Sequence, residues 1–303
     1  MSSIQFVPAE QLSGGIGTIT PVLLPRLDKL YQQRAKRLQQ LAQDHPMQDY
    51  LLFCAQMALA QQEVVHKLAL PKTAIEIIQQ RLGKEHPPLN WQKLERDHYW
   101  HTALNSIVEQ VKDLSTEQVQ AVCQQLLVAS TEQLESAAGY LLAQKFSQVP
   151  KGWALFLWSA LSVYWAQMAE ALSASAKADY GEQRQFCPVC GGVPCASVIR
   201  GGAQNGLRYL HCNLCESQWH LVRVKCSNCE GTSGLHYWSL DEKNATIKAE
   251  SCDACESYLK VIYQEKDLHL EVIADDLASL ALDAGVEEEG FSRSGLNPYL
   301  LPS

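Results

Sequence analysis

The chain has 303 residues, of which 47% are hydrophobic, and it carries a formal net charge of -8 at pH 7. This is the composition of an ordinary soluble protein, and the length can bury a sizeable core in one large domain or two smaller ones. The first residues, MSSIQFVPAEQLSGG, contain neither a basic n-region nor an apolar h-region. The sequence therefore predicts no secretory signal and a cytoplasmic location.

Residues 25–176 follow a helical pattern, in which apolar residues recur three or four positions apart. The sequence STEQ occurs at Ser115 and again at Ser130, where a serine N-cap with glutamine at the third position after it forms a capping box. We expect six or seven helices in an antiparallel bundle that occupies residues 1–180. Prolines end or interrupt the periodic segments at Pro46, Pro71, Pro87, Pro88 and Pro150.

The segment GWALFLWSALSVYWAQMA, residues 152–169, contains no charged side chain and is just long enough to reach the lower limit of a membrane-spanning length. Its aromatic residues Trp158, Tyr164 and Trp165 lie inside the segment rather than at its two ends, and no basic cluster flanks it. We therefore predict a central buried helix of the bundle and no integral membrane span.

A di-iron site is one alternative within the bundle. Glu63 with His66, and Glu95 with His98, form Glu-x-x-His pairs on predicted helices, the spacing that di-iron bundles use. Prolines separate the two pairs, and charged residues beside His98 indicate a solvated face, so we favour ordinary helix residues over a metal site. Further carboxylates for such a site would come from Glu109, Glu132, Glu135 or Glu170.

Eight of the 11 cysteines form four CxxC pairs, which begin at Cys187, Cys212, Cys226 and Cys252. The second two pairs repeat the first two at a nearly constant offset along the chain, and CNLCES returns as CDACES. Similarity at a nearly fixed period indicates a duplicated structural unit. In a reducing compartment, such pairs indicate metal or redox chemistry more than structural disulfides.

Two CxxC knuckles together make a tetrahedral site of four sulfurs, which suits zinc or iron, and backbone N–H groups of the turns can donate to the thiolates. The loops between the knuckles, residues 191–211 and 230–251, have a length typical of zinc ribbons and rubredoxin-like folds. We predict a first module over residues 181–224 and a second over residues 225–265, packed side by side. If each copy folds as one unit, the metal ligands are Cys187, Cys190, Cys212 and Cys215 in the first and Cys226, Cys229, Cys252 and Cys255 in the second.

Disulfides and redox-active dithiols remain the alternatives for these eight thiols. Glycine can take the positive φ that a knuckle turn demands, and Gly191 and Gly231 are predicted to do so. A site with four sulfur ligands has no open position for a substrate, so we favour a structural role and expect no enzyme.

The other cysteines and the nearby histidines are interpreted as non-ligands. Cys54 and Cys123 lie on apolar helix faces and are expected in the core. Because four sulfurs complete each tetrahedron, no further ligand is needed near the knuckles. The residues excluded on this ground are Cys195, His211, His220 and His236.

Residues 266–303 form the fourth predicted part of the chain. Alternation in YLKVIYQEKDLHLEV predicts one more strand or hairpin arm, DDLASLALD predicts a short helix, and GFSRSGLNPYLLPS is expected to be an irregular tail. From residue 264 onward there are nine acidic residues against Lys266 and Arg293. We interpret this acidity as a solvated chain end. The predicted fold is therefore α+β, an N-terminal all-α helical bundle followed by two tandem rubredoxin-like or zinc-ribbon modules.

The four knuckles, the bridge CESQWHLVRVKCSNCEG, the segments SCDACESYLKVI and ADDLASLALD, and the ending GFSRSGLNP resemble the formate dehydrogenase accessory protein family, FdhE. The resemblance is specific over residues 186–298. It implies a cytoplasmic maturation factor that contacts the molybdenum-containing catalytic subunit of respiratory formate dehydrogenase and binds iron through rubredoxin-like motifs. It also implies that the family's thiols fall on the eight paired cysteines, with no counterpart for Cys195.

Two other functions remain open. A rubredoxin-like electron-transfer protein acting on the client's redox centre would require iron, because zinc has no redox chemistry here. A zinc-ribbon module that binds nucleic acid would require positive charge, whereas residues 187–260 carry seven acidic and seven basic residues. We therefore expect no nucleic-acid partner, and the sequence does not determine the oligomeric state.

Overall fold

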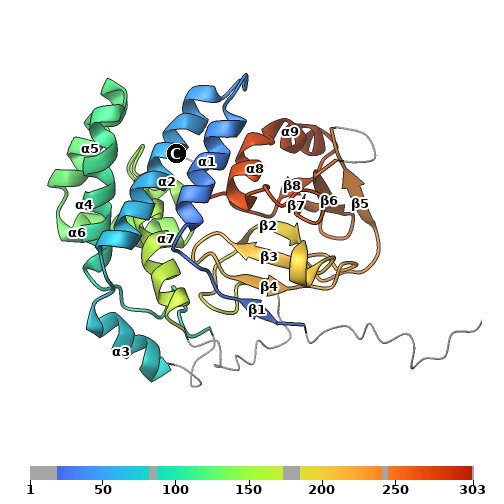
Figure 1. The fold of residues 1–303 in the computed structure, drawn as a ribbon, viewed down its shortest axis with the longest axis horizontal. Coiled ribbons are helices and arrows are strands. Elements are labelled where there is room, and N and C mark those ends of the chain that lie inside the picture. Colours follow the sequence, from blue (N-terminus) through green and yellow to red (C-terminus); the bar gives the residue numbers. More distant parts are fainter. Residues whose placement is uncertain (1–18, 82–86, 173–184, 241–244, 302–303) are drawn as a thin grey trace, which may run out of the picture.

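The computed structural model describes residues 19–81, 87–172, 185–240 and 245–301, so the predicted boundary between the bundle (residues 1–180) and the first module (residues 181–224) lies outside the described residues. Figure 1 shows a helical part beside a sheet that carries two further helices. The helices of the first part are α1 (Leu30–Leu41), α2 (Gln48–Lys67), α3 (Lys72–Arg81), α4 (Tyr99–Val111), α5 (Glu117–Val128), α6 (Thr131–Leu142) and α7 (Ala154–Glu170).

Helix α7 is the centre of the helical part, as the uncharged segment predicts. All of its residues from Ala154 to Ala169 are buried except Leu155. Its polar groups have partners: Gln61 of α2 donates to the carbonyl of Ser159 at 3.0 Å and to Ser162 Oγ at 3.1 Å, as buried polar groups require. Among the described residues, no helix is long and apolar enough to cross a membrane.

The two STEQ sequences have different outcomes. Ser130 caps α6 and forms the complete capping box with Gln133, which confirms that prediction. The prediction for Ser115 is wrong by one position, because Thr116 is the N-cap of α5 and its side chain accepts from Val119 N. Ser115 instead donates to the carbonyl of Val111, at the end of the preceding turn.

In the described part of the chain, the strands form one eight-stranded sheet in the order β1-β4-β3-β2-β7-β6-β5, with β8 paired to β7. The pairing between β2 and β7 is parallel, and it joins the two cysteine modules into one continuous sheet (Figure 1). The modules are therefore fused through backbone hydrogen bonds rather than simply adjacent. The strands are β1 (Val22–Leu23), β2 (Pro194–Ile199), β3 (Arg208–Cys212), β4 (Gln218–His220), β5 (Leu235–Trp238), β6 (Ile247–Cys252), β7 (Ser257–Tyr263) and β8 (Ser292–Arg293).

The acidic C-terminal part is not a solvated end, so that interpretation is wrong. Helix α8 (Val272–Ala278) contacts both α1 and β2, and helix α9 (Leu280–Glu288) follows it. Asp276 is fully buried between Lys260 Nζ at 3.1 Å and Arg293 Nη2 at 2.5 Å. These cations outweigh the effect of burial and lower the pKa of Asp276, so this acid is a paired charge inside the fold. Glu287, Glu288 and Glu289, at the end of α9, are exposed.

The predicted irregular tail also packs into the structure. Residues of β8 pair with the beginning of β7, and Tyr299 is buried, with its hydroxyl donating to Gln61 Oε1 at 2.7 Å. The last described residues therefore contact α2, in the helical part of the chain.

A charged cluster on the helical part gives a pH-dependent prediction. Glu135 of α6 lies 2.7 Å from Arg96 and 3.0 Å from His101. Burial alone would raise the pKa of Glu135, but these partners outweigh burial and lower it from its usual 4.5 to about 2. A carboxyl group with a lowered pKa in the folded state stabilises the fold fully above its unfolded pKa, and this contribution is lost as the pH falls toward 2.

Glu135→Gln is therefore expected to lower the free energy of unfolding by about 2 kcal/mol at pH 7, after allowance for partial exposure of the side chain. The difference from wild type should shrink to less than half at pH 3. Urea unfolding at both pH values measures it, with Glu132→Gln, an exposed residue of the same helix, as the control. A deficit that stayed constant from pH 7 to pH 3 would contradict the assigned ionisation.

Candidate metal centres

The structure gathers the eight paired cysteines into two clusters, in the sets that the repeat predicts. Cys187, Cys190, Cys212 and Cys215 form the first cluster; Cys226, Cys229, Cys252 and Cys255 form the second. Within each cluster all four sulfur atoms lie within 4.8 Å of one another. Each set of sulfurs can hold one metal ion.

The distances between sulfurs agree with tetrahedral coordination. Metal–sulfur bonds of about 2.3 Å place the sulfurs of a tetrahedral site about 3.8 Å apart. In the first cluster the sulfurs of Cys187 and Cys215 are 3.6 Å apart and those of Cys190 and Cys212 are 3.4 Å apart. In the second, those of Cys226 and Cys255 are 3.8 Å apart and those of Cys229 and Cys252 are 3.7 Å apart. The donor set therefore fits zinc or iron, both of which accept four thiolates.

All four knuckles share one backbone feature. The residue after the second cysteine of each knuckle has positive φ: Gly191 at 76°, Glu216 at 61°, Glu230 at 63° and Glu256 at 52°. The prediction for Gly191 is confirmed, but Glu230 rather than Gly231 takes the left-handed conformation of the third knuckle.

Gly231 serves a different purpose. A Cβ atom at this position would lie 3.4 Å from the sulfur of Cys229, and one at Gly192 would lie 3.2 Å from the sulfur of Cys190. Both glycines therefore let the backbone approach a sulfur closely. Gly192 N donates to Cys190 Sγ at 3.3 Å, as expected for a knuckle that stabilises thiolates.

The first cluster is closed to solvent, and its four cysteines are 0% exposed. Burial raises the pKa of Cys190 and Cys212 well above the ordinary thiol value. Four thiolates in such a place therefore require a compensating cation, which a metal ion would supply. This requirement and the sulfur spacing together indicate a metal site rather than four free thiols.

The helical part covers the first cluster. Leu89 N donates to the carbonyl of Val189 at 2.9 Å, and Trp91 N donates to the carbonyl of Cys190 at 3.0 Å. From α7, Trp158 Nε1 donates to the carbonyl of Asn213 at 3.0 Å. Both knuckles of the first cluster are thus hydrogen-bonded to elements of the helical part.

A buried ion pair adds to this connection. Arg34 of α1 donates to both carboxylate oxygens of Glu216, at 2.9 Å and 2.8 Å, and both side chains are 1% exposed. His211 Nε2 lies 2.8 Å from the same carboxylate. Burial alone would raise the pKa of Glu216, but these partners lower it to about 2, so it stays ionised.

The second cluster differs sharply in exposure. Cys226 and Cys252 are buried, whereas Cys229 is exposed and Cys255 is half-buried. The third knuckle is held by its own module, since Asn228 Nδ2 donates to Ser257 Oγ at 3.1 Å. The second site is therefore accessible from solvent, and the first is not.

The residues interpreted as non-ligands lie outside both clusters. Cys195 donates toward Asp276 Oδ2 at 3.6 Å, His236 lies 2.9 Å from Asp253 Oδ2, and His211 faces Glu216 as described. His220 lies in β4, so all three histidines are strand residues. Cys54 and Cys123 are fully buried, as predicted.

The di-iron alternative is not supported by the described residues. Glu63 pairs with exposed Lys67 at 2.6 Å, and Glu95 and His98 precede α4 rather than lying on a helix. Glu135 is taken by Arg96 and His101, and Glu170 accepts from Leu27 N at 2.7 Å. In the described part of the chain, the only groups of at least three metal-binding side chains are the two cysteine clusters.

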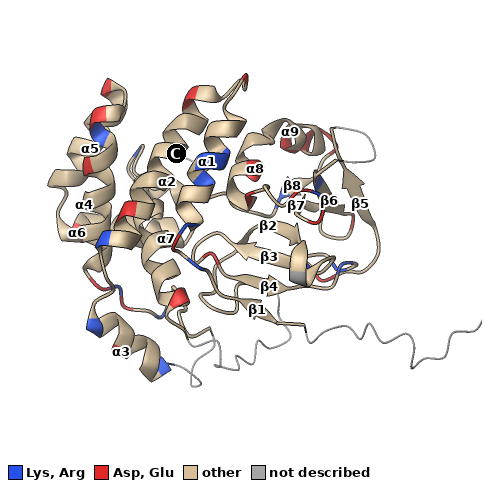
Figure 2. Cartoon of the chain, in the orientation of Figure 1, with Lys and Arg blue, Asp and Glu red and all other residues tan. Residues whose placement is uncertain are grey.

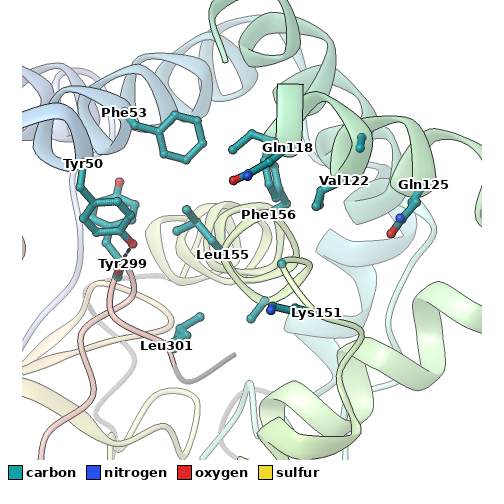
Figure 3. A pocket seen from close by; sticks show the side chains of 14 residues that line it. Tyr50, Phe53, Gln118, Val122, Gln125, Lys151, Leu155, Phe156, Tyr299 and Leu301 are labelled. Carbon is teal, nitrogen blue, oxygen red and sulfur yellow. Dashed lines mark hydrogen bonds between the residues drawn. The ribbon is translucent and has the colours of Figure 1, made fainter. Parts of the chain in front are cut away.

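The helical part also contains a pocket of about 800 Å³ between α2, α5, the beginning of α7 and the C-terminal residues (Figure 3). Its walls are mainly apolar, with Lys151 as the one charged residue among those that line it. The labelled apolar and aromatic side chains are Tyr50, Phe53, Val122, Leu155, Phe156, Tyr299 and Leu301. The pocket suits an apolar group, and its lining has no carboxylate or histidine to act as acid or base.

Sequence reasoning did not identify the ion pair that links α1 to the second knuckle. The repeated sequence CES places a glutamate directly after a knuckle, and such a residue needs either solvent or a basic partner. The sequence therefore indicated that a partner was possible. The sequence could not show that Glu216 meets Arg34, which is 182 residues away, whereas its repeat counterpart Glu256 is exposed.

Comparison with known proteins identifies the whole chain. Family models match residues 19–182 ("FdhE, N-terminal"), 186–223 ("FdhE, central domain") and 224–300 ("FdhE, C-terminal domain"). A protein FdhE homolog of Serratia proteamaculans is 49% identical over 306 residues, and protein FdhE of Escherichia coli is 48% identical over 304 residues. These matches cover 99% of this chain and 99% and 98% of the two relatives.

A solved structure agrees with the sequence matches. The crystal structure of the FdhE protein from Pseudomonas aeruginosa superposes with a TM-score of 0.83 at 36% identity. The alignment covers 93% of this chain and 99% of that protein. With both modules, the helical part and the full length accounted for, the chain belongs to the FdhE family of accessory proteins.

Proposed function

We propose that this protein is a cytoplasmic accessory factor that binds the catalytic subunit of a respiratory formate dehydrogenase during its maturation. The observation that carries the proposal is the match to the FdhE family over all three parts of the chain. A site with four sulfur ligands has no open position at which to activate water. Such centres suit a protein that acts by binding rather than by turnover.

The eight paired cysteines are the proposed metal ligands, four to each ion, and iron is the proposed metal with zinc as the alternative. The sulfur distances fit both metals, so they do not distinguish them. An iron ion in this environment would supply a single-electron couple. The chain itself supplies the charge-compensated thiolates, the N–H donors of the knuckles and the shielding of the first site.

A second candidate is one-electron transfer to a redox centre of the client, and one observation favours it. Cys229 is exposed and Cys255 is half-buried, so a partner can approach the second site closely. The first site, behind the helical part, has no such access. Electron transfer would therefore use the second site.

Charge argues against a nucleic-acid partner. Of the basic residues of the metal-bearing segment, Arg208 and Lys260 are buried in ion pairs with Glu250 and with Asp276 and Asp283. Figure 2 shows the strands mostly without charge, with separate basic and acidic residues on the connections. Phosphate binding requires a continuous basic surface.

Co-purification tests the proposal directly. A tagged copy of this chain, made in cells that produce formate dehydrogenase, is expected to capture the catalytic subunit, and deletion of its gene is expected to abolish formate dehydrogenase activity. The tag alone is the control. Recovery of no catalytic subunit, together with a fully active enzyme in the deletion strain, would overturn the proposal.

A further inference from the structure

The two modules follow one another in the same direction along the sheet. The first consists of β2, β3 and β4, the second of β5, β6 and β7, and the order β4-β3-β2-β7-β6-β5 places the first strand of one beside the last strand of the other. The contact between them, β2 with β7, is parallel. In such an arrangement β4 and β5 are the terminal strands of the two modules. The outer edge of each has no partner from within the two modules.

The chain closes one of these edges itself. β4 is the repeat counterpart of β7, and its outer edge is paired with β1, where Val22 lies opposite Trp219. The other edge belongs to β5, and within the described residues no strand pairs with it. Because β1 already pairs with the outer edge of β4, a second copy of this chain cannot pair its β4 with β5 in the way that β7 pairs with β2.

Strand register identifies which groups β5 presents. Ser197 lies opposite Leu210 in the first module, and Tyr237 lies opposite Glu250 in the second. In the sequence, Tyr237 lies one period of the repeat after Ser197, and Glu250 lies one period after Leu210. Tyr237 is therefore the counterpart of Ser197. Ser197 is paired with Val261 of β7. In an antiparallel ladder, alternate residues direct their N–H and C=O groups to the partner strand and away from it.

This alternation fixes the orientation of β5. Gly234 O accepts from Asp253 N at 2.9 Å, so the residues that bond toward β6 are Gly234, His236 and Trp238. The N–H and C=O groups of Leu235 and Tyr237 therefore face the open edge. The corresponding N–H and C=O groups of β2 face β7 and pair with it.

An exposed aromatic side chain lies on this edge strand. Tyr237 is 49% exposed, and its hydroxyl donates to Glu250 of β6 at 2.5 Å. An exposed apolar group beside an open strand edge is typical of sites that take up an extended peptide.

We propose that β5 is the docking strand for the client, and that it pairs in parallel with an extended segment of the client polypeptide. This inference rests on the proposed function and names the surface through which it acts. The segment carries apolar side chains at alternate positions, so that one of its faces meets Tyr237. Its backbone pairs with Leu235 and Tyr237, next to the exposed Cys229 of the second site.

Proline at position 237 tests this pairing selectively. The substitution Tyr237→Pro removes an N–H that faces the open edge and leaves the ladder to β6 intact, which is where edge strands tolerate proline. Tyr237→Ala removes the same side chain and keeps the N–H. Both variants lose the hydroxyl hydrogen bond to Glu250. They should therefore have the same metal content and the same urea-unfolding midpoint as each other.

Capture of the formate dehydrogenase catalytic subunit by each full-length chain is then measured. Tyr237→Pro is expected to weaken capture about tenfold relative to Tyr237→Ala, because a strand-pairing hydrogen bond and its neighbour are lost together. Equal capture by the two variants would overturn docking at β5 while leaving the proposed function in place. No capture by the wild-type chain would overturn the proposed function itself.

Two further measurements, hydrogen exchange and sedimentation, test the same proposal independently of the capture experiment. If Tyr237→Pro loses metal or stability, hydrogen exchange of the wild-type chain replaces it: the amides of Leu235 and Tyr237 are expected to become protected when the catalytic subunit is added, and unchanged exchange there would overturn the proposal. Sedimentation of the chain alone addresses the other occupant. A dimer that Tyr237→Pro dissociates would assign the edge to a second copy and overturn client docking.

Discussion

A chelator is expected to remove one metal ion per chain within minutes and the other only when the protein unfolds. All four cysteines of the first cluster are 0% exposed, and the helical part covers both of its knuckles. In the second cluster Cys229 is exposed, so a competing ligand can displace its thiolate without opening the fold. Exchange at the buried site must await an opening of the protein, and exchange at the exposed site need not.

The measurement uses protein purified without oxygen, with iron, zinc and sulfide counted per chain before EDTA is added. Two ions per chain should be lost in two phases of equal size. Guanidinium is the control, because it should release both ions together. Loss of both ions in one fast phase from the folded chain would contradict the difference between the two sites.

Serine substitutions at matching positions separate the two phases. Cys190 and Cys229 are the second thiols of the first and third knuckles and occupy equivalent positions of the repeat. Cys229→Ser is expected to give a folded chain that lacks the fast phase. Cys190→Ser is expected to cost roughly 5 kcal/mol or more of folding free energy, because metal binding at a buried structural site is itself folding free energy. Similar stability of the two variants would contradict this assignment.

Much of the site followed from local sequence because its causes are local. Four CxxC pairs in register define four turns, and the nearly constant period of the repeat pairs the turns correctly. The buried helix α7 was equally readable, since a long uncharged segment without flanking basic residues favours a protein core. The capping box at Ser130 needs only Ser130, Gln133 and the turn between them to form.

The parts that sequence did not reveal depend on contacts between distant residues. The β2–β7 pairing joins Ser197 to Val261, and parallel pairing leaves no turn signal between the strands it joins. The acids of the C-terminal part resembled a solvated tail because Lys260 and Arg293, which neutralise Asp276, lie 16 and 17 residues away from it. At the third knuckle, Glu230 takes positive φ without glycine, so the turn is imposed by the fold rather than by residue preference.

Arg34→Met is expected to destabilise the folded chain by about 3 to 5 kcal/mol, because it leaves the carboxylate of Glu216 buried without its partner. Arg34 and Glu216 are each 1% exposed and share two hydrogen bonds. Among the described residues, His211, which lies 2.8 Å from the same carboxylate, is the remaining basic group in contact with it. The loss should be measured by urea unfolding of the metal-loaded protein at pH 7, with Lys36→Met, an exposed residue of the same helix, as the control.

A second substitution distinguishes loss of the ion pair from loss of side-chain packing as the cause of destabilisation. Adding Glu216→Gln to Arg34→Met removes the unpaired charge, so the double variant should recover at least about 1 kcal/mol relative to Arg34→Met alone. The same pair joins α1 to the second knuckle of the first cluster, so Arg34→Met should also speed release of the slowly exchanging metal ion, whereas Lys36→Met should not. A loss below about 1 kcal/mol for Arg34→Met would mean that water reaches Glu216, and the first site would then not be sealed by the helical part.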